Sequence, residues 1–220
     1  MLVLALALAL LVISIGFAMT ALILDDRRFA LFFSEAGPIE NATLWGWVLL
    51  AGFSVVVLRR ITRPSLSGMV LCLAAAAREA DWHKEFTGYS VMKIGFYHDS
   101  ARGVGERLLA FFIVAAVIAS AVILVRSVLT RWRLSAEKPP TWGVVTVLAI
   151  GWLITTKIAD RFRDIFNDLT GFEFSETAKN MLSAVEEGGE LLLPLLFGVA
   201  VWVFARSHHD RRDASTTDGL

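Results

Sequence analysis

The sequence is poor in cysteine and histidine, and it has no excess of either charge. Cys72 is the single cysteine among 220 residues and lies in an apolar run, which excludes a disulfide framework and a thiolate zinc site. The 21 Lys and Arg balance the 21 Asp and Glu, so there is no electrostatic basis for binding nucleic acid. Internal repeats, low-complexity tracts and linkers are also absent from the sequence, and we therefore expect one domain.

Apolar residues are abundant instead. Hydrophobic residues make up 56% of the chain, whereas a soluble domain usually contains about 45–50%. The mean hydropathy is +0.62. A bilayer core of about 30 Å needs roughly 20 apolar residues per helix, and Leu2 to Leu24 provides them without one charge. This stretch lacks a basic segment before it and is too long for a signal peptide, so we interpret it as a retained first span.

The sequence predicts an all-α, polytopic transmembrane helix bundle over residues 1–207. We expect six spans, near residues 2–24, 45–58, 66–80, 108–125, 141–158 and 182–205. The apolar, aromatic segment 86–107 is expected to lie at the membrane interface or to dip into the bundle. The polar segment 208–220 is expected to be a disordered tail. The bilayer is the expected partner, in a bacterial inner membrane.

Basic residues predict the orientation of the spans. Ten Lys and Arg lie in short segments against helix ends on one side, which favours the cytoplasm for that side and for both termini. Seventeen acids then face outward. The basic residues that decide the orientation are Arg59, Arg60, Arg63, Arg126, Arg131, Arg133, Lys138, Arg206, Arg211 and Arg212.

Three carboxylates stand at the start of the sixth span. At 100° per residue, Glu186 and Glu190 lie about 40° apart and Glu187 about 60° further on. Gly188 and Gly189 lie roughly opposite and would let another helix come close. Charge next to an apolar run is costly in lipid and usually has a function. Three carboxylates so close together need cations beside them to stay ionised.

The end of the fifth span carries candidate cations. Its charged residues fall on one face of a helix, within an arc of about 100°. They can neutralise one another along the helix, or Lys157 or Arg161 can pair with the glutamates of the sixth span. The set comprises Lys157, Asp160, Arg161, Asp164 and Asp168.

The third span also ends in charge. Arg78 and Asp81 share one face of the helix, and Glu79 and His83 share another at a spacing of four residues. An acid and a histidine at this spacing can reach one divalent cation or one proton-transfer partner, although two ligands do not make a site. The alternative is a hydrogen-bonded histidine at the interface. Glu40 follows Pro38 at the start of the second span. An acid in the first turn of a helix is common because it interacts favourably with the helix dipole, and the alternative is that Glu40 points inward.

Three of these features together resemble an uncharacterised group of bacterial multi-pass inner-membrane proteins. The features are the acidic Gly-Pro turn at 34–40, the Glu-x-Asp-Trp helix end at 78–82 and the Glu-rich helix start at 186–190. The turn departs from the group pattern because Ala36 stands where an Asp is usual. The resemblance implies a class of membrane protein and no activity.

The sequence leaves three functions open. The first is an outward-facing charged cluster that binds a cation, a proton or a polar head group. An extended version of this function also transports the ligand. The second is a membrane-embedded hydrolase or transferase acting on a lipid-linked substrate, with Glu190 or Glu186 as acid or base and His83 as its partner. The third is a structural assembly subunit whose charges are satisfied within the bundle. The ligand and any metal remain open.

Overall fold

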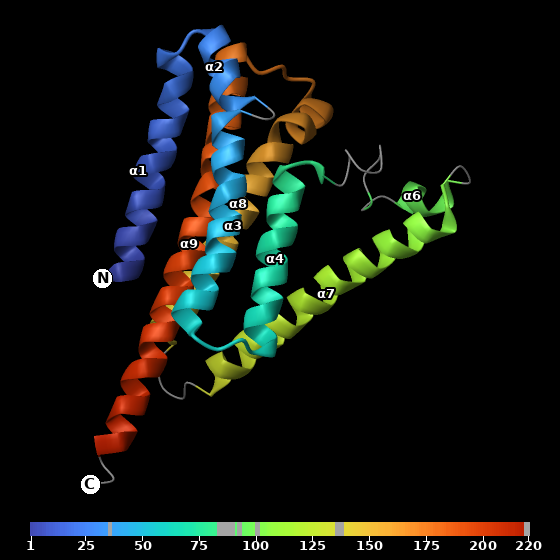
Figure 1. Ribbon diagram of the computed structural model, residues 1–220. Coiled ribbons are helices and arrows are strands. Elements are labelled where there is room, and N and C mark those ends of the chain that lie inside the picture. Colours follow the sequence, from blue (N-terminus) through green and yellow to red (C-terminus); the bar gives the residue numbers. More distant parts are fainter. Residues whose placement is uncertain (35–36, 83–90, 92–93, 100–101, 135–138, 218–220) are drawn as a thin grey trace. The chain divides into compact units, whose positions relative to one another are not determined.

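The computed structural model describes residues 1–34, 37–82, 91, 94–99, 102–134 and 139–217, without the side chains of Asp160, Arg163, Asp164 and 208–217. All regular secondary structure in this part of the chain is helical (Figure 1). The helices are α1 (Leu2–Ile23), α2 (Asp26–Phe33), α3 (Pro38–Leu58), α4 (Arg63–Glu79), α6 (Ile94–His98), α7 (Val104–Arg133), α8 (Thr141–Thr170) and α9 (Glu176–Thr217).

Five stretches of the described chain are long and apolar enough to cross a membrane. They are Leu2–Ile23, Asp26–Leu58, Val104–Arg133, Thr141–Ala159 and Glu176–Ser207. The chain thus has the helices of a multi-pass membrane protein. The expected span at 66–80 is helical within α4, but 17 residues extend only about 25 Å, less than a bilayer core of about 30 Å. A membrane crossing by residues 66–80, the third of the six expected spans, therefore remains a prediction.

The helices that carry charge run on beyond the expected spans. α8 continues past residue 158 to Thr170, where Gly171 adopts a left-handed conformation with φ of 67° and donates to the carbonyl of Asn167. α9 begins at Glu176, six residues before the expected start, and continues to Thr217. It includes residues 208–217, for which the sequence predicts a disordered tail. Backbone hydrogen bonds of a helix are internal, so a helix can continue from lipid into water.

The chain divides into two compact units. Unit 1 contains Met1–Gly46 and Lys138–Leu220, and unit 2 contains Trp47–Glu137. The first residues of α3 belong to unit 1, together with α1, α2, α8 and α9. α4, α6, α7 and the rest of α3 belong to unit 2.

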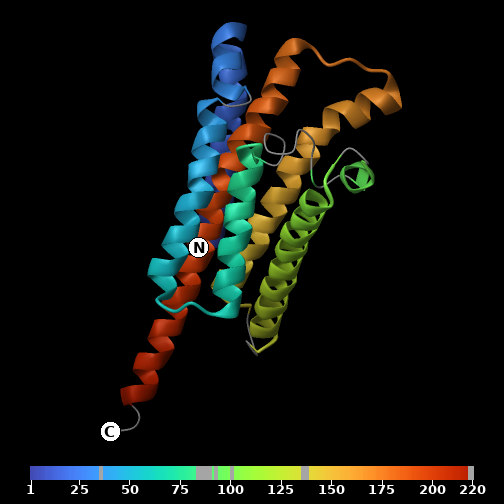
Figure 2. The ribbon, with the colours of Figure 1, turned by 45° about the vertical axis from the view of Figure 1, so that its right-hand side comes forward.

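In unit 1, α9 packs along α8 and α1. α9 runs antiparallel to both of them, as Figures 1 and 2 show. One apolar cluster joins the three helices through Leu10, Ala149, Leu192 and Leu196. A second cluster is built on Phe29, Phe33 and Ala184 and includes side chains of α1 and α3. The level between these two clusters carries the charged residues described below.

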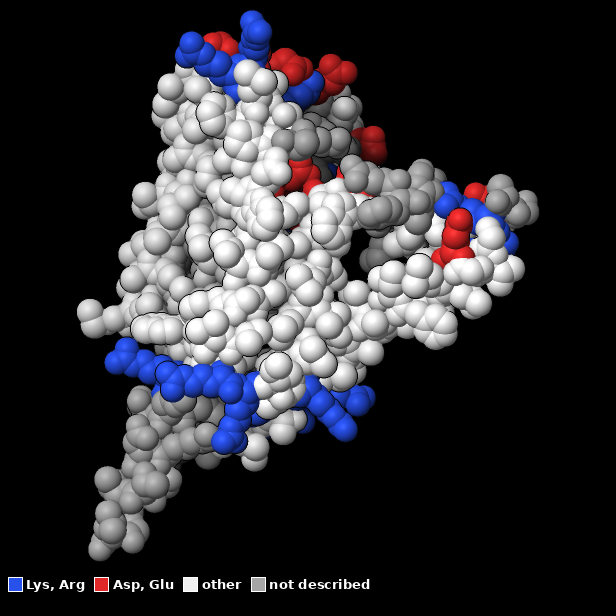
Figure 3. Space-filling model, in the orientation of Figure 1, with Lys and Arg blue, Asp and Glu red and all other residues white. Residues whose placement is uncertain are grey.

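Charge is distributed along unit 1 as a membrane protein requires. At the end where α1 meets α2 and α8 passes to α9, acidic and basic side chains intermingle (Figure 3). Arg28 pairs with Asp25 there, and Lys179 pairs with Glu176. The middle of α1 exposes large apolar side chains without any charge, such as Leu8 and Val12. Such an uncharged, apolar exterior is suited to contact with lipid.

In unit 2, α4 packs against α7. The turn between α3 and α4 and the last turns of α7 carry arginines, and the described residues of these segments include no acid (Figure 3). Within the expected interfacial segment 86–107, α6 buries Phe96 completely, and the Arg102 guanidinium lies 4.6 Å from the centre of its ring. Arg107 donates to the carbonyl oxygens of Tyr97 and Arg102. This part of the segment is held by local contacts.

Thr62 fixes the start of α4 through a capping box. Its hydroxyl accepts from the Ser65 amide at 3.4 Å, and the Ser65 hydroxyl accepts from the Thr62 amide at 2.6 Å. Thr62→Ala should therefore lower the free energy of unfolding by about 1 kcal/mol. Thr155→Ala is the control, because Thr155 is exposed within α8 and should change stability by less than about 0.5 kcal/mol. Melting followed by circular dichroism in detergent compares the two, and equal melting temperatures would refute the capping role.

Candidate functional site

A buried ion pair joins α8 to α9. The Lys157 ammonium donates a hydrogen bond to Oε1 of Glu190, 33 positions away in the sequence. The Glu190 side chain is 8% exposed, whereas the Lys157 side chain is 33% exposed. Of the two alternatives that the sequence leaves open for Lys157, the structure shows the pairing with a glutamate of the last span. Lys157 reaches from the helix surface into the interior, and Glu190 lies inside.

Two glycines bring the backbones together beside this pair. A Cβ on Gly188 would lie 2.3 Å from the Phe17 ring of α1, and a Cβ on Gly189 would lie 2.5 Å from the Thr156 methyl of α8. The expected close approach at these glycines is thus present, and it involves two different helices. Trp152 locks the α8 contact, because its indole Nε1 donates to the Gly189 carbonyl at 3.0 Å. Glu190 therefore lies next to a close contact between α8 and α9.

Pro194 follows Glu190 by one helical turn. Proline has no backbone N–H, so the Glu190 carbonyl receives no hydrogen bond from the residue that would normally supply it. A Cβ on Gly46 of α3 would lie 2.8 Å from Cγ of Pro194, so α3 also approaches closely here. Glu190 thus has two groups that accept hydrogen bonds, its carboxylate and its backbone carbonyl.

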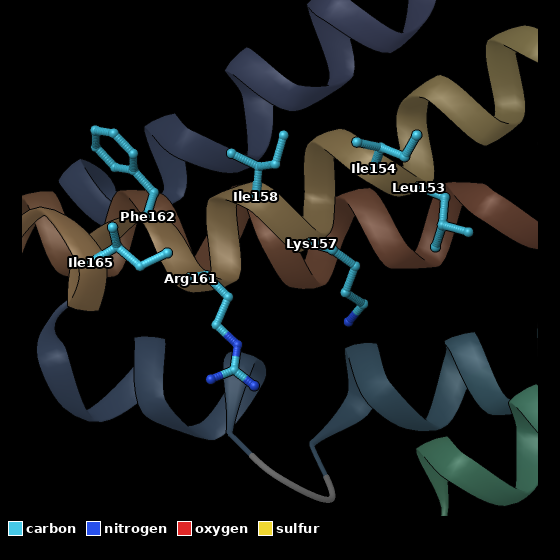
Figure 4. Close-up of a pocket in the computed structure, with 7 residues that line it drawn as sticks. All are labelled: Leu153, Ile154, Lys157, Ile158, Arg161, Phe162 and Ile165. Atoms are coloured by element: carbon cyan, nitrogen blue, oxygen red, sulfur yellow. The ribbon is translucent and has the colours of Figure 1, made fainter.

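A groove of about 690 Å³ lies along α8, and Lys157 and Arg161 line it. Figure 4 shows these two side chains leaving the helix on the same side. The other lining side chains are apolar: Leu153, Ile154, Ile158, Phe162 and Ile165. Ile154, Ile158 and Phe162 form one row at spacings of four residues, and Leu153 and Ile165 stand at the two ends of the row that contains Lys157 and Arg161. The groove extends over about 18 Å of helix.

The groove straddles the end of a candidate span. The apolar stretch of α8 ends at Ala159, so Leu153 and Ile154 belong to it and Phe162 and Ile165 lie beyond it. Arg161 lies just past this end and Lys157 just before it. The cations therefore stand close to the end of the candidate span. Lysine and arginine in such a place usually keep their charged heads in water while their stems lie along apolar surface.

The other candidate residues of unit 1 differ in their burial. Glu186 and Glu187 are half-buried on α9, one turn before Glu190. Glu40 is half-buried in the first turn of α3, where an acid suits the helix dipole. Asp160 and Asp164 lie on α8, but their side chains fall outside the described ones. Asp168 is exposed near the end of α8.

The charged end of the third span lies in unit 2. Glu79 is half-buried and its carboxylate lies 3.8 Å from the exposed Arg78 guanidinium. Asp81 is half-buried with a positive φ of 49°. His83, the proposed partner of Glu79 at a metal, falls outside the described residues. Among the residues that are described, no three His, Cys, Asp or Glu lie close enough together to hold a metal ion.

Comparison with known proteins adds no family. No protein-family model, no curated protein and no solved structure matches the chain. The chemistry of the site therefore has to be argued from its own residues.

Sequence reasoning missed the apolar partners of the two cations. Trp152 and Thr156 were not singled out, although they contact Gly189, and neither were Leu153 and Ile154 of the groove. A signal for the groove was present, because Leu153, Lys157, Arg161 and Ile165 repeat every four residues. The contacts of Trp152 and Thr156 had no such signal, since they depend on how α8 is set against α9.

Proposed function

We propose that this chain is an integral membrane protein that binds an anionic polar head group at Lys157 and Arg161, in the groove of α8. The observation that carries the proposal is the composition of the groove. It places two cations one turn apart among five apolar side chains, at the end of a membrane span. The cations complement a phosphate or carboxylate, and the apolar side chains complement an acyl chain.

The position of the groove favours a membrane lipid as the ligand. Between Leu153 and Ala159 the groove follows the candidate span for about 9 Å, and Phe162 and Ile165 lie beyond that span. A lipid chain can lie against Leu153 and Ile154 while its head group meets Lys157 and Arg161. A small soluble anion would use the cations and leave the apolar side chains without a role. The negative charge of the head group and the apolar character of the chain therefore define the ligand class together.

A thermal-stability assay tests this proposal. In detergent, phosphatidylglycerol, which is anionic, should raise the melting temperature, whereas zwitterionic phosphatidylcholine should not. At a lipid concentration of about 100 times Kd, the expected rise is roughly 5–10 °C. Lys157→Gln with Arg161→Gln should abolish the shift. Lys179→Gln is the matched control, because Lys179 also pairs with a glutamate in unit 1 and lies outside the groove.

Two outcomes would contradict head-group binding. In the first, both lipids raise the melting temperature equally, which would indicate general solvation by lipid. In the second, the Lys157 and Arg161 variant keeps the whole shift, which would place binding elsewhere. A variant with both Lys157→Gln and Glu190→Gln checks folding, since two amides can hydrogen-bond to each other in place of the ion pair.

A second candidate is structural, and the packing around Gly188 and Gly189 favours it. An ion pair next to such close helix contacts fixes which residues of α8 and α9 meet. On this account the pair sets the register of an assembly subunit and needs no ligand. Loss of stability without any change in lipid response, on substituting Lys157, would support this candidate over head-group binding.

A further inference from the structure

The apolar face of α8 continues beyond the end of the candidate span at Ala159. At 100° per residue, the isoleucines, phenylalanines and leucine that form this face fall within an arc of about 120°. They are Ile154, Ile158, Phe162, Ile165, Phe166 and Leu169. All of them are exposed except Phe166, which is half-buried. Ile154 and Ile158 belong to the candidate span, so one exposed apolar stripe runs from the span into the last turns of the helix.

Polar residues occupy the rest of these last turns. Asn167, Asp168 and Thr170 lie outside the apolar arc, and all three are exposed. The sequence also places charged residues directly after the span: Asp160, Arg161, Arg163 and Asp164. A stretch with so much charge is too polar to lie wholly in hydrocarbon. A helix that is apolar on one face and polar on the other is suited to the boundary between lipid and water.

The connection between α8 and α9 adds aromatic rings to the same apolar face. The ring centre of Phe174 lies 5.5 Å from that of Phe166 and 6.1 Å from that of Phe162. The ring centre of Phe172 lies 6.0 Å from that of Phe166 and 5.4 Å from that of Phe174. Despite these contacts Phe172 is 55% exposed, and Leu169 is 79% exposed. The described chain therefore leaves a broad apolar surface uncovered at this end of α8.

The arrangement of unit 1 indicates what covers this surface. The last turns of α8 diverge from α9, and the connection between them returns to the start of α9, as Figures 1 and 2 show. At the same end of the unit, α2 also exposes large apolar side chains, Leu31 and Phe32. Two separate connections thus present apolar surface at one end of the unit. A bilayer surface can cover both, because it is continuous.

We propose that the segment from Ala159 to Phe174 lies in the surface of the bilayer, with its apolar face toward the acyl chains and its polar face toward water. Interfacial helices of this kind bury their apolar face about 5–10 Å into the boundary between head groups and acyl chains. The segment anchors α8 at the depth where its candidate span ends. This placement goes beyond head-group binding in the groove, because it requires no ligand there.

Spin labels on the two faces of the segment test this placement. One cysteine at a time is introduced into the full chain carrying Cys72→Ala, which is reconstituted in vesicles of phosphatidylcholine and phosphatidylglycerol. Leu169→Cys puts the label on the apolar face. Asn167→Cys is the matched control, because Asn167 is also exposed and lies about 160° away around the helix. Power saturation then measures how often each label meets oxygen, which concentrates in lipid, and a polar nickel chelate, which stays in water.

We expect the ratio of oxygen access to nickel access to be several times higher at Leu169 than at Asn167. A label at Phe172→Cys should behave like the label at Leu169. Equal access of the nickel chelate to Leu169 and Asn167 would overturn the proposal, because both faces would then lie in water. A label at Leu169 that neither reagent reaches would also overturn it, in favour of a second copy of the chain on this face. Leu169 and Asn167 are exposed, so neither label displaces a packed side chain.

Discussion

Replacing Lys157 with methionine should lower the free energy of unfolding by about 3 kcal/mol, because it removes the ammonium that pairs with a buried carboxylate. Removal of one partner from a fully buried pair costs about 3–5 kcal/mol, and we expect the low end because Lys157 is partly exposed. Methionine keeps most of the length of the lysine stem. The loss should therefore report the missing charge and not a cavity.

A double-mutant cycle separates the ion pair from the packing. Glu190→Leu should restore most of the stability that Lys157→Met loses, since an apolar pair of similar volume is often as stable as a buried ion pair. Reversible unfolding in mixed micelles, followed by circular dichroism, measures all four proteins. Lys179→Met is the control, and its exposed pair with Glu176 should contribute at most about 1 kcal/mol. Equal effects of Lys157→Met and Lys179→Met would show that the Glu190 pair contributes no more than a surface ion pair.

The second large effect is expected at Gly189. Alanine there would place a methyl group 2.5 Å from Cγ2 of Thr156, which is almost fully buried. Thr156 is β-branched and its hydroxyl donates to the Leu153 carbonyl at 2.9 Å, so its side chain cannot rotate without loss. Overpacking of this kind costs about 1–3 kcal/mol, against a gain of about 1 kcal/mol in helix propensity. We expect net destabilisation and a weaker Trp152 hydrogen bond to Gly189.

Gly151→Ala is the matched control for this substitution. Gly151 lies within α8, and a Cβ there would have no atom within 4 Å. Alanine should therefore stabilise the protein by up to about 1 kcal/mol through helix propensity alone. The two substitutions differ only in their surroundings, so their effects on the melting temperature should have opposite signs. A stabilising effect at both positions would mean that α8 and α9 are not closely packed at Gly189.

Much of the fold could be predicted from the sequence because lipid imposes long apolar runs. The first span was predicted almost to the residue, since no charge occurs between Leu2 and Ile23. The ends of α8 and α9 were predicted less well. Their charged extensions obey ordinary helix propensity and carry no apolar signal. α4 presents a different difficulty. Its apolar run predicts a helix, but the run does not decide whether a helix of 17 residues spans a membrane.

The candidate site could be predicted only in part. Charge next to an apolar run singled out Lys157 and Glu190, and helical geometry placed the glycines opposite the acids. Which cation meets which acid depends on the register between α8 and α9, and no local pattern encodes that register. The groove was missed for a related reason. Its apolar residues look like an ordinary lipid-facing surface, and only the structure shows that they line one groove together with Lys157 and Arg161.

An anionic lipid in the groove of α8 should stay with the protein when it is extracted gently from its membrane. Native mass spectrometry detects such a lipid by counting the phospholipids that each chain retains. We predict that the wild type and Lys179→Gln retain an anionic phospholipid that survives removal of the detergent, and that Lys157→Gln with Arg161→Gln loses it. Equal retention by all three proteins, or retention of zwitterionic lipid alone, would contradict this expectation and favour the structural role of the ion pair.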